Sequence, residues 1–220
     1  MNHLIFLAHI IIISSCTLYF GTLGKSALIS YVSLLFVLAN IFVVKQIQLL
    51  GFAVTSADAY IIGVSFGINL IQEIWGKKSA QQAIFISFAC SLFYLVMGYF
   101  QIGYLPALHD TSHVHFSYLM NHSLRIIIAS FISYLIVQYA DTMMYGFLKT
   151  KCDGKYFIIR NYISMFSSQL FDTILFSFLG LYGIVQNISH IMIVSYGVKI
   201  VAIFLTTPFI YYAKKIVKKS

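Results

Sequence analysis

Charged residues are scarce in this chain of 220 residues. Asp, Glu, Lys and Arg together make up 9% of it, whereas 60% of the residues are hydrophobic. A soluble domain usually carries about 25% charged residues. The composition therefore excludes a soluble globular domain. It predicts an all-α, polytopic bundle of six or seven transmembrane helices that forms one domain, residues 1–220, within the lipid bilayer.

Cysteine is also scarce, and the three cysteines lie far apart at positions 16, 90 and 152. This spacing fits neither a disulfide framework nor a paired-cysteine metal site. Residues 13–16 faintly resemble a lipoprotein cleavage box, but no Lys or Arg precedes them as a signal peptide requires. The stretch HDTSHVH at 109–115 has ligand-type residues without the convergence that a metal site needs. We expect an uncleaved first span, no metal and no cofactor.

Seven apolar runs are long enough to cross a hydrocarbon core of about 30 Å, which takes roughly 20 helical residues. Gly, Asn and charged residues within the first three runs leave totals of six or eight spans open. The runs lie at 4–23, 27–46, 56–75, 80–104, 122–147, 158–184 and 190–213.

Basic residues fall in alternate connections between these runs. Lys and Arg near span ends stay on the cytoplasmic side, so we expect the N-terminus outside and the C-terminus inside. The formal net charge of +8 is then a topology signal, and no nucleic-acid partner is needed to explain it. The outer loop 105–121 is expected to lie at the interface as a short helix. The basic residues are Lys25, Lys77, Lys78, Lys149, Lys151, Lys155, Arg160, Lys214, Lys215, Lys218 and Lys219.

Among the ionisable residues within the apolar runs, five stand out: Asp58, Glu73, Asp141, Asp172 and Lys199. A charge inside a span is costly, so such groups face protein or water and are candidates for function. Asp172 and Lys199 lie closest to span centres and carry opposite charges, so we expect them to pair between the last two spans. A purely structural ion pair is the alternative to a functional one.

One polar pattern occurs twice, in SYLIVQYADT at 133–142 and in SMFSSQLFDT at 164–173. Each copy has Ser, four residues, Gln, two residues and Asp-Thr, and this spacing puts the Gln and the Asp on one helix face. The two spans run in opposite directions, so the match suits an inverted repeat of the kind found in transporters. Chance similarity between two apolar helices is the alternative.

An amide beside a carboxylate is suited to a purine-like edge. A carboxylate accepts two parallel N–H bonds, and an amide both donates and accepts. Together they match the ring N–H, exocyclic amine and carbonyl of a guanine-like base. Aromatic residues, which are 17% of the chain, can stack on such a base. Most of them are expected to be ordinary apolar residues of the spans and of the membrane interface.

Four stretches, 40–84, 124–149, 159–183 and 195–212, carry a specific set of motifs in order. These are EIWGKK at 73–78, an Arg…Ala-Ser…Gln…Asp pattern over 125–141, and the Ser…Gln…Asp-Thr pattern that ends at 173. With them the chain resembles the queuosine precursor transporter family, also described as vitamin-uptake-like. The resemblance implies a multi-pass importer of 7-deazaguanine compounds in the bacterial inner membrane.

The polar positions of that family imply a set of substrate-binding candidates. We expect Gln138, Gln169 and Asp172 to bind the base edge, with hydrogen bonding between helices as the alternative. Lys199 is expected to orient Asp172 or to meet a substrate carbonyl. The candidate residues are Asn40, Lys45, Asn69, Glu73, Arg125, Gln138, Asp141, Gln169, Asp172 and Lys199.

Several of these positions have competing explanations. Arg125, near the outer end of its span, can simply snorkel to the interface, and Glu73 at an inner end can fix topology or form a gate. Lys45 does not fit the positive-inside pattern. Three positions depart from the family, and one of them is Gly63, where a proline is expected. Asn69 stands where members commonly have Asp, and Asp58 stands where a small residue is expected.

Three kinds of function stay open. The first is a stand-alone importer in which a carboxylate can carry a proton with the substrate. The second is a substrate-binding subunit of a multi-component vitamin-type system, or an importer of another purine-like or vitamin compound. The third is an intramembrane enzyme or structural protein. No Walker motif or nucleophile–base order is present, so we expect no enzyme. Small-residue faces are too diffuse to define an interface for a homodimer.

Overall fold

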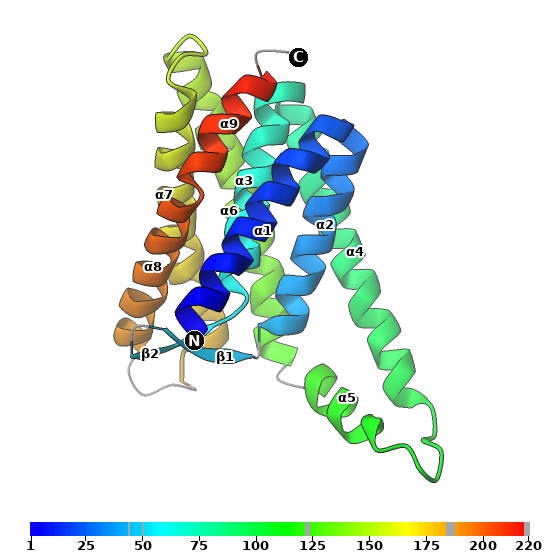
Figure 1. The fold of residues 1–220 in the computed structure, drawn as a ribbon. Coiled ribbons are helices and arrows are strands. Elements are labelled where there is room, and N and C mark those ends of the chain that lie inside the picture. Colours follow the sequence, from blue (N-terminus) through cyan, green and yellow to red (C-terminus); the bar gives the residue numbers. More distant parts are fainter. Residues whose placement is uncertain (44, 50, 122–123, 184–187, 218–220) are drawn as a thin grey trace.

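The fold is a bundle of long helices, most of which run between the same two ends (Figure 1). The computed structural model describes residues 1–43, 45–49, 51–121, 124–183 and 188–217. A π-helix, η1 (Ser177–Leu181), directly continues α7. The helices are α1 (Asn2–Leu23), α2 (Lys25–Phe42), α3 (Asp58–Trp75), α4 (Lys77–Gly103), α5 (Ser112–Asn121), α6 (Leu124–Lys151), α7 (Phe157–Phe176), α8 (Ile188–Leu205) and α9 (Thr207–Val217).

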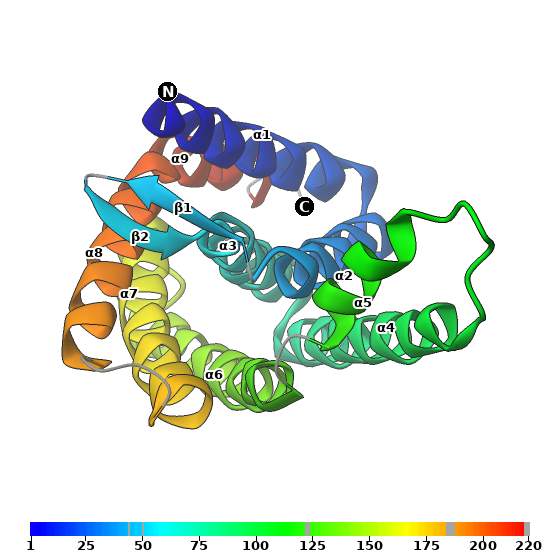
Figure 2. The same cartoon turned by 90° about the horizontal axis from the view of Figure 1, so that it is seen from below.

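Over the described residues, five helices are long and apolar enough to cross a membrane: α1, α2, α4, α7 with η1, and α8. The environment of α3 explains why it is more polar. Residues 62–72 of α3 are buried without interruption, and the view along the bundle shows α3 enclosed by its neighbours (Figure 2). A helix shielded from lipid can carry polar residues that bind other helices. The predicted all-α membrane bundle is confirmed.

The last predicted run contains a break. Residues 190–213 form two helices that meet at Thr206, where α8 has ended and α9 has not begun. Pro208 has no N–H and cannot donate to the carbonyl of Phe204 one turn earlier. The hydroxyl of Thr207 donates to that carbonyl instead. The helix is therefore interrupted without leaving this carbonyl unpaired.

The predicted C-terminal boundary of the second run is wrong. Helix was expected up to residue 46, but α2 ends at Phe42 and an antiparallel hairpin follows, made of β1 (Gln46–Leu49) and β2 (Phe52–Thr55). Gly51, between the strands, has a φ of 84°, a conformation that glycine adopts without steric cost. The hairpin crosses one end of the bundle (Figure 1). Apolar character alone could not distinguish this segment from the end of a span.

The two ends of the bundle differ in charge. The α1–α2, α3–α4 and α6–α7 connections lie at one end with the end of α9, and the N-terminus, the hairpin and α5 lie at the other (Figure 1). The first end holds Lys25, Lys77 and the basic loop 149–160, so the positive-inside rule predicts that it is the cytoplasmic end. We call it the inner end and the opposite one the outer end. The short helix expected in the outer loop is α5.

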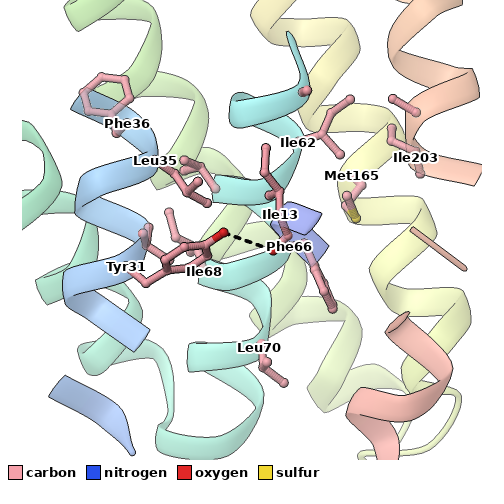
Figure 3. Close-up of a cluster of buried hydrophobic side chains, with 14 of the residues drawn as sticks. Ile13, Tyr31, Leu35, Phe36, Ile62, Phe66, Ile68, Leu70, Met165 and Ile203 are labelled. Atoms are coloured by element: carbon pink, nitrogen blue, oxygen red, sulfur yellow. Dashed lines mark hydrogen bonds between the residues drawn. The ribbon is translucent and has the colours of Figure 1, made fainter. Parts of the chain in front are cut away.

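Close packing holds α3 against α1 and α2. A buried hydrophobic cluster joins the three helices (Figure 3), and within it the hydroxyl of Tyr31 donates to the carbonyl of Ile13 at 3.1 Å. A Cβ on Gly63 would lie 2.4 Å from Cγ2 of Ile13, and a Cβ on Gly67 would lie 2.5 Å from Cγ2 of Val32. Small residues let transmembrane helices approach closely. The position of α3 therefore depends on these two glycines.

We expect Gly67→Ala to destabilise the protein, because the added methyl group meets a β-branched side chain that cannot turn aside freely. Overpacking of this kind typically costs about 1–3 kcal/mol. Gly197→Ala in α8 is the matched control, since nothing lies within 4 Å of a Cβ at that position, and it should be neutral or slightly stabilising. The measurement is the thermal unfolding midpoint in detergent. Equal midpoints for the two variants would contradict the packing of α3.

Candidate functional site

A cavity of about 440 Å³ lies at the outer end of the bundle. Small-molecule sites usually have volumes of about 300–1,000 Å³, so this one can hold a compound of the size of a nucleobase. Its walls come from α2, α3, α6, α7, η1 and α8, and the hairpin closes part of it. The hairpin residues that line it are Gln46, Phe52, Val54 and Thr55.

Aromatic side chains form part of the cavity wall. Phe36 of α2 and Tyr134 of α6 are stacked, with ring centroids 3.6 Å apart, and Phe176 of α7 also lines the cavity. At its outer edge, His190 at the start of α8 contacts Phe52 of the hairpin, with ring centroids 6.0 Å apart. These aromatic groups give the cavity surfaces on which a flat ligand can pack.

Three charged side chains lie together in the cavity: Lys199 of α8, Asp172 of α7 and Asp58 of α3. Nζ of Lys199 donates to Oδ2 of Asp172 at 2.7 Å and to Oγ1 of Thr173 at 3.2 Å. It lies 3.9 Å from Oδ1 of Asp58. The Lys199 and Asp58 side chains are only 4% and 5% exposed. The predicted pair between the last two spans is confirmed, and Asp58 is a third member that the sequence did not place beside it.

The two glutamines of the repeated pattern meet at one serine. Oγ of Ser65 in α3 accepts from Nε2 of Gln138 at 3.2 Å and from Nε2 of Gln169 at 2.9 Å, so α3 joins α6 to α7. Gln138 also lines the cavity, whereas Gln169 is fully buried and does not line it. Ser65 gave no signal in the sequence, because a single serine in an apolar helix is unremarkable.

The two carboxylates of the repeated pattern lie in different surroundings. Asp172 lines the cavity. Asp141 is buried, its Oδ1 accepts from the hydroxyl of Ser164, and no described residue binds its Oδ2. Asn69 is also fully buried, and neither polar atom of its side chain has a partner among the described residues. Of these candidates, only Asp172 reaches the cavity directly.

The remaining outer candidates differ in their relation to the cavity. Asn40 donates to Oγ of Ser91 at 2.9 Å, and its Oδ1 accepts from Oγ of Ser130 at 3.0 Å. Since Ser130 lines the cavity, Asn40 positions a wall residue. Lys45 is exposed between α2 and β1 and does not line the cavity. Arg125 belongs to the first turn of α6, and its side chain lies outside the described part of the chain.

Glu73 lies at the centre of an ionic network at the inner end. Nη1 and Nη2 of Arg160 donate to its two carboxylate oxygens at 3.0 and 3.1 Å, and the hydroxyl of Tyr145 donates to Oε2 at 3.0 Å. Nζ of Lys149 lies 3.3 Å from Oε2. Arg160 also donates to two carbonyls of the α6–α7 loop. The network ties α3 to α6 and α7 at the end opposite the cavity.

Residues 59–213 match the protein family described as "Putative vitamin uptake transporter". The chain belongs to this family. It is also 27% identical over 204 residues to the "Probable queuosine precursor transporter" of Bacillus subtilis (strain 168), a match that covers 91% of this chain and 89% of that protein. No solved structure matches. The resemblance inferred from the motifs is thereby confirmed, and the protein is a multi-pass membrane transporter.

The inner network of this transporter should be essential to its stability. In Glu73→Gln, the Arg160 guanidinium, whose side chain is 1% exposed, loses the carboxylate that compensates its charge. Breaking a buried ion pair in this way costs about 3–5 kcal/mol. Lys149→Ala is the control, because a partly exposed pair contributes only about 0–1 kcal/mol. Denaturant unfolding in detergent measures both. A small, equal effect of the two substitutions would show that the network does not hold the inner end together.

Proposed function

We propose that this transporter imports queuosine precursors, which are 7-deazaguanine bases, across the bacterial inner membrane. The observation that carries the proposal is the cavity, which combines two carboxylates, an amide and a lysine with aromatic walls. The name of the Bacillus subtilis relative supports the same class of substrate. The function is transport, and no step of it requires the chain to act as an enzyme.

The polar groups of the cavity complement the edge of such a base. A 7-deazaguanine presents a ring N–H and an exocyclic amine, which are donors, beside a carbonyl acceptor. Asp172 can accept two parallel N–H bonds, and Lys199 beside it can donate to the carbonyl. Gln138 has an amide oxygen that no described residue binds, so it supplies a further acceptor. Phe36 and Tyr134 supply aromatic surface against the ring.

The arrangement of the two ends suits a carrier that faces outward. The cavity lies at the outer end beneath the hairpin, and the inner end is held together by the Glu73 network. Release to the cytoplasm then requires that network to separate while the outer end closes. In transporters, binding sites between repeats alternate between the two sides in this way. The described conformation corresponds to the substrate-accepting stage of the cycle.

A second candidate is favoured by the family description, which specifies vitamin uptake. In that case the chain binds its substrate but needs a separate energising complex, or it carries a different purine-like or vitamin compound. Uptake by the purified chain alone in proteoliposomes distinguishes the two arrangements. A stand-alone importer accumulates substrate under an imposed ion gradient without ATP, whereas a binding subunit does not.

The test of the proposed function is rescue of queuosine in tRNA. The host is a bacterial strain without its own importer and without its own synthesis of 7-deazaguanines, fed at low external base concentration. We expect the intact protein to restore queuosine and Asp172→Asn to reduce initial uptake at least about 10-fold, the effect of losing a hydrogen bond to a charged group. Asp153→Asn, in the α6–α7 loop, is the matched control, and membrane levels of each protein are measured.

The outcomes separate substrate recognition from folding. Loss of rescue in Asp172→Asn at normal membrane levels supports a base-binding carboxylate. Rescue by Asp172→Asn at the intact rate would show that this carboxylate does not bind the base. No rescue by the intact protein, with normal expression and with uptake also absent in proteoliposomes, would overturn the proposed substrate.

A further inference from the structure

The charges in the cavity do not balance. Among the described residues that line it, two carboxylates, Asp58 and Asp172, face one ammonium group, that of Lys199, and the imidazole of His190 lies at the outer edge against Phe52. Nζ of Lys199 donates one hydrogen bond to Oδ2 of Asp172 at 2.7 Å and a second to Oγ1 of Thr173 at 3.2 Å. Asp58 lies 3.9 Å from Nζ, beyond hydrogen-bonding distance. The base-binding roles assigned above leave Asp58 without a function.

The second carboxylate oxygen of Asp58 is buried without a hydrogen-bonding partner among the described residues. No described residue donates to Oδ2, although the side chain is 95% buried or more. A buried carboxylate without a hydrogen-bonding partner is strongly unfavourable. The start of α3 and the ammonium group of Lys199, 3.9 Å from Oδ1, reduce this cost without donating a hydrogen bond to Oδ2. A cationic ligand in the cavity would supply the donor and would also neutralise the net negative charge.

We propose that Asp58 binds an ammonium group of the substrate, so that the transporter selects amine-bearing 7-deazaguanines over neutral ones. This inference rests on the proposed function. In a 7-aminomethyl-7-deazaguanine the amine projects from the five-membered ring, on the side of the ring carbonyl opposite to the ring N–H and the exocyclic amine. One molecule can therefore present its donor edge to Asp172 and its ammonium group to Asp58, on the two sides of Lys199. A 7-cyano base offers the same edge but no cation for Asp58.

The experiment compares three ligands that share the base edge. They are the 7-aminomethyl base, the neutral 7-cyano base, and the N-acetylated 7-aminomethyl base, which keeps the substituent but removes its charge. Each is titrated into the purified intact protein in lipid nanodiscs by calorimetry at neutral pH. We expect the charged base to bind at least about 10-fold more tightly than either neutral base, the discrimination expected of one charge-assisted hydrogen bond.

The variants assign this preference to one residue. Asp58→Asn keeps the shape of the side chain and should weaken binding of the charged base about 10-fold or more, while binding of the 7-cyano base stays close to that of the intact protein. Asp58→Glu keeps the charge and should retain a preference for the charged base. Asp153→Asn makes the same chemical change away from the cavity and should leave all three affinities unchanged.

Failure of this inference is distinguishable from failure of the proposed function. If the intact protein binds the charged and neutral bases equally, Asp58 does not select an amine, but the function stands. If it binds none of them, the function itself is wrong. If Asp58→Asn weakens all three ligands equally, Asp58 acts in structure or proton transfer and the inference is overturned. If Asp58→Asn does not fold, the preference of the intact protein and its retention in Asp58→Glu decide the question.

Discussion

A polar helix buried at the centre of a membrane bundle is the constraint on which the rest of this structure depends. No water is available in the hydrocarbon region to satisfy polar groups, so each buried one needs a protein partner or a ligand. Along α3 the partners come from different helices. Ser65 accepts from glutamines of α6 and α7, Gln72 donates to a backbone carbonyl of α6 at 2.7 Å, and Asp58 faces α8. The polar residues of α3 thus specify which helices must surround it.

The two ends of α3 differ in what their acidic residues contact. Asp58 is its first residue and lines the outer cavity, whereas Glu73 lies in its last turn and holds the inner network. These positions are separated by about 22 Å along a helix that rises 1.5 Å per residue. At the inner end every carboxylate oxygen of Glu73 has a partner. At the outer end an oxygen of Asp58 has none among the described residues. Of the two carboxylates of α3, the one at the closed inner end is therefore fully paired, and the one beside the cavity is not.

Much of this arrangement followed from the sequence because it depends on local pattern or on charge. Apolar runs predicted the helices, the distribution of lysines predicted which ends lie together, and opposite charges near span centres predicted the pair of Asp172 with Lys199. The hairpin could not be predicted in this way, since residues 46–55 are as apolar as the end of a span. The position of Asp58 beside Lys199 could not be predicted from the sequence either. It depends on how α3 packs against α8, and that packing rests on contacts such as that of Gly67 with α2, which no motif records.

The opposite directions of α6 and α7 place the aspartates of the repeated pattern toward opposite ends of the bundle. α6 runs from the outer to the inner end and α7 runs back (Figure 1), and the glutamine of each copy is fixed at Ser65. In both copies the aspartate follows the glutamine by three residues, so the two carboxylates lie on opposite sides of Ser65. Asp172 lies toward the outer end and lines the cavity, whereas Asp141 lies toward the inner end and is buried against Ser164. The Gln and Asp-Thr positions that the two copies share are thus presented toward opposite ends of the bundle, one carboxylate lining the cavity and the other buried. If the two spans form an inverted repeat, this is the asymmetry that alternating access requires.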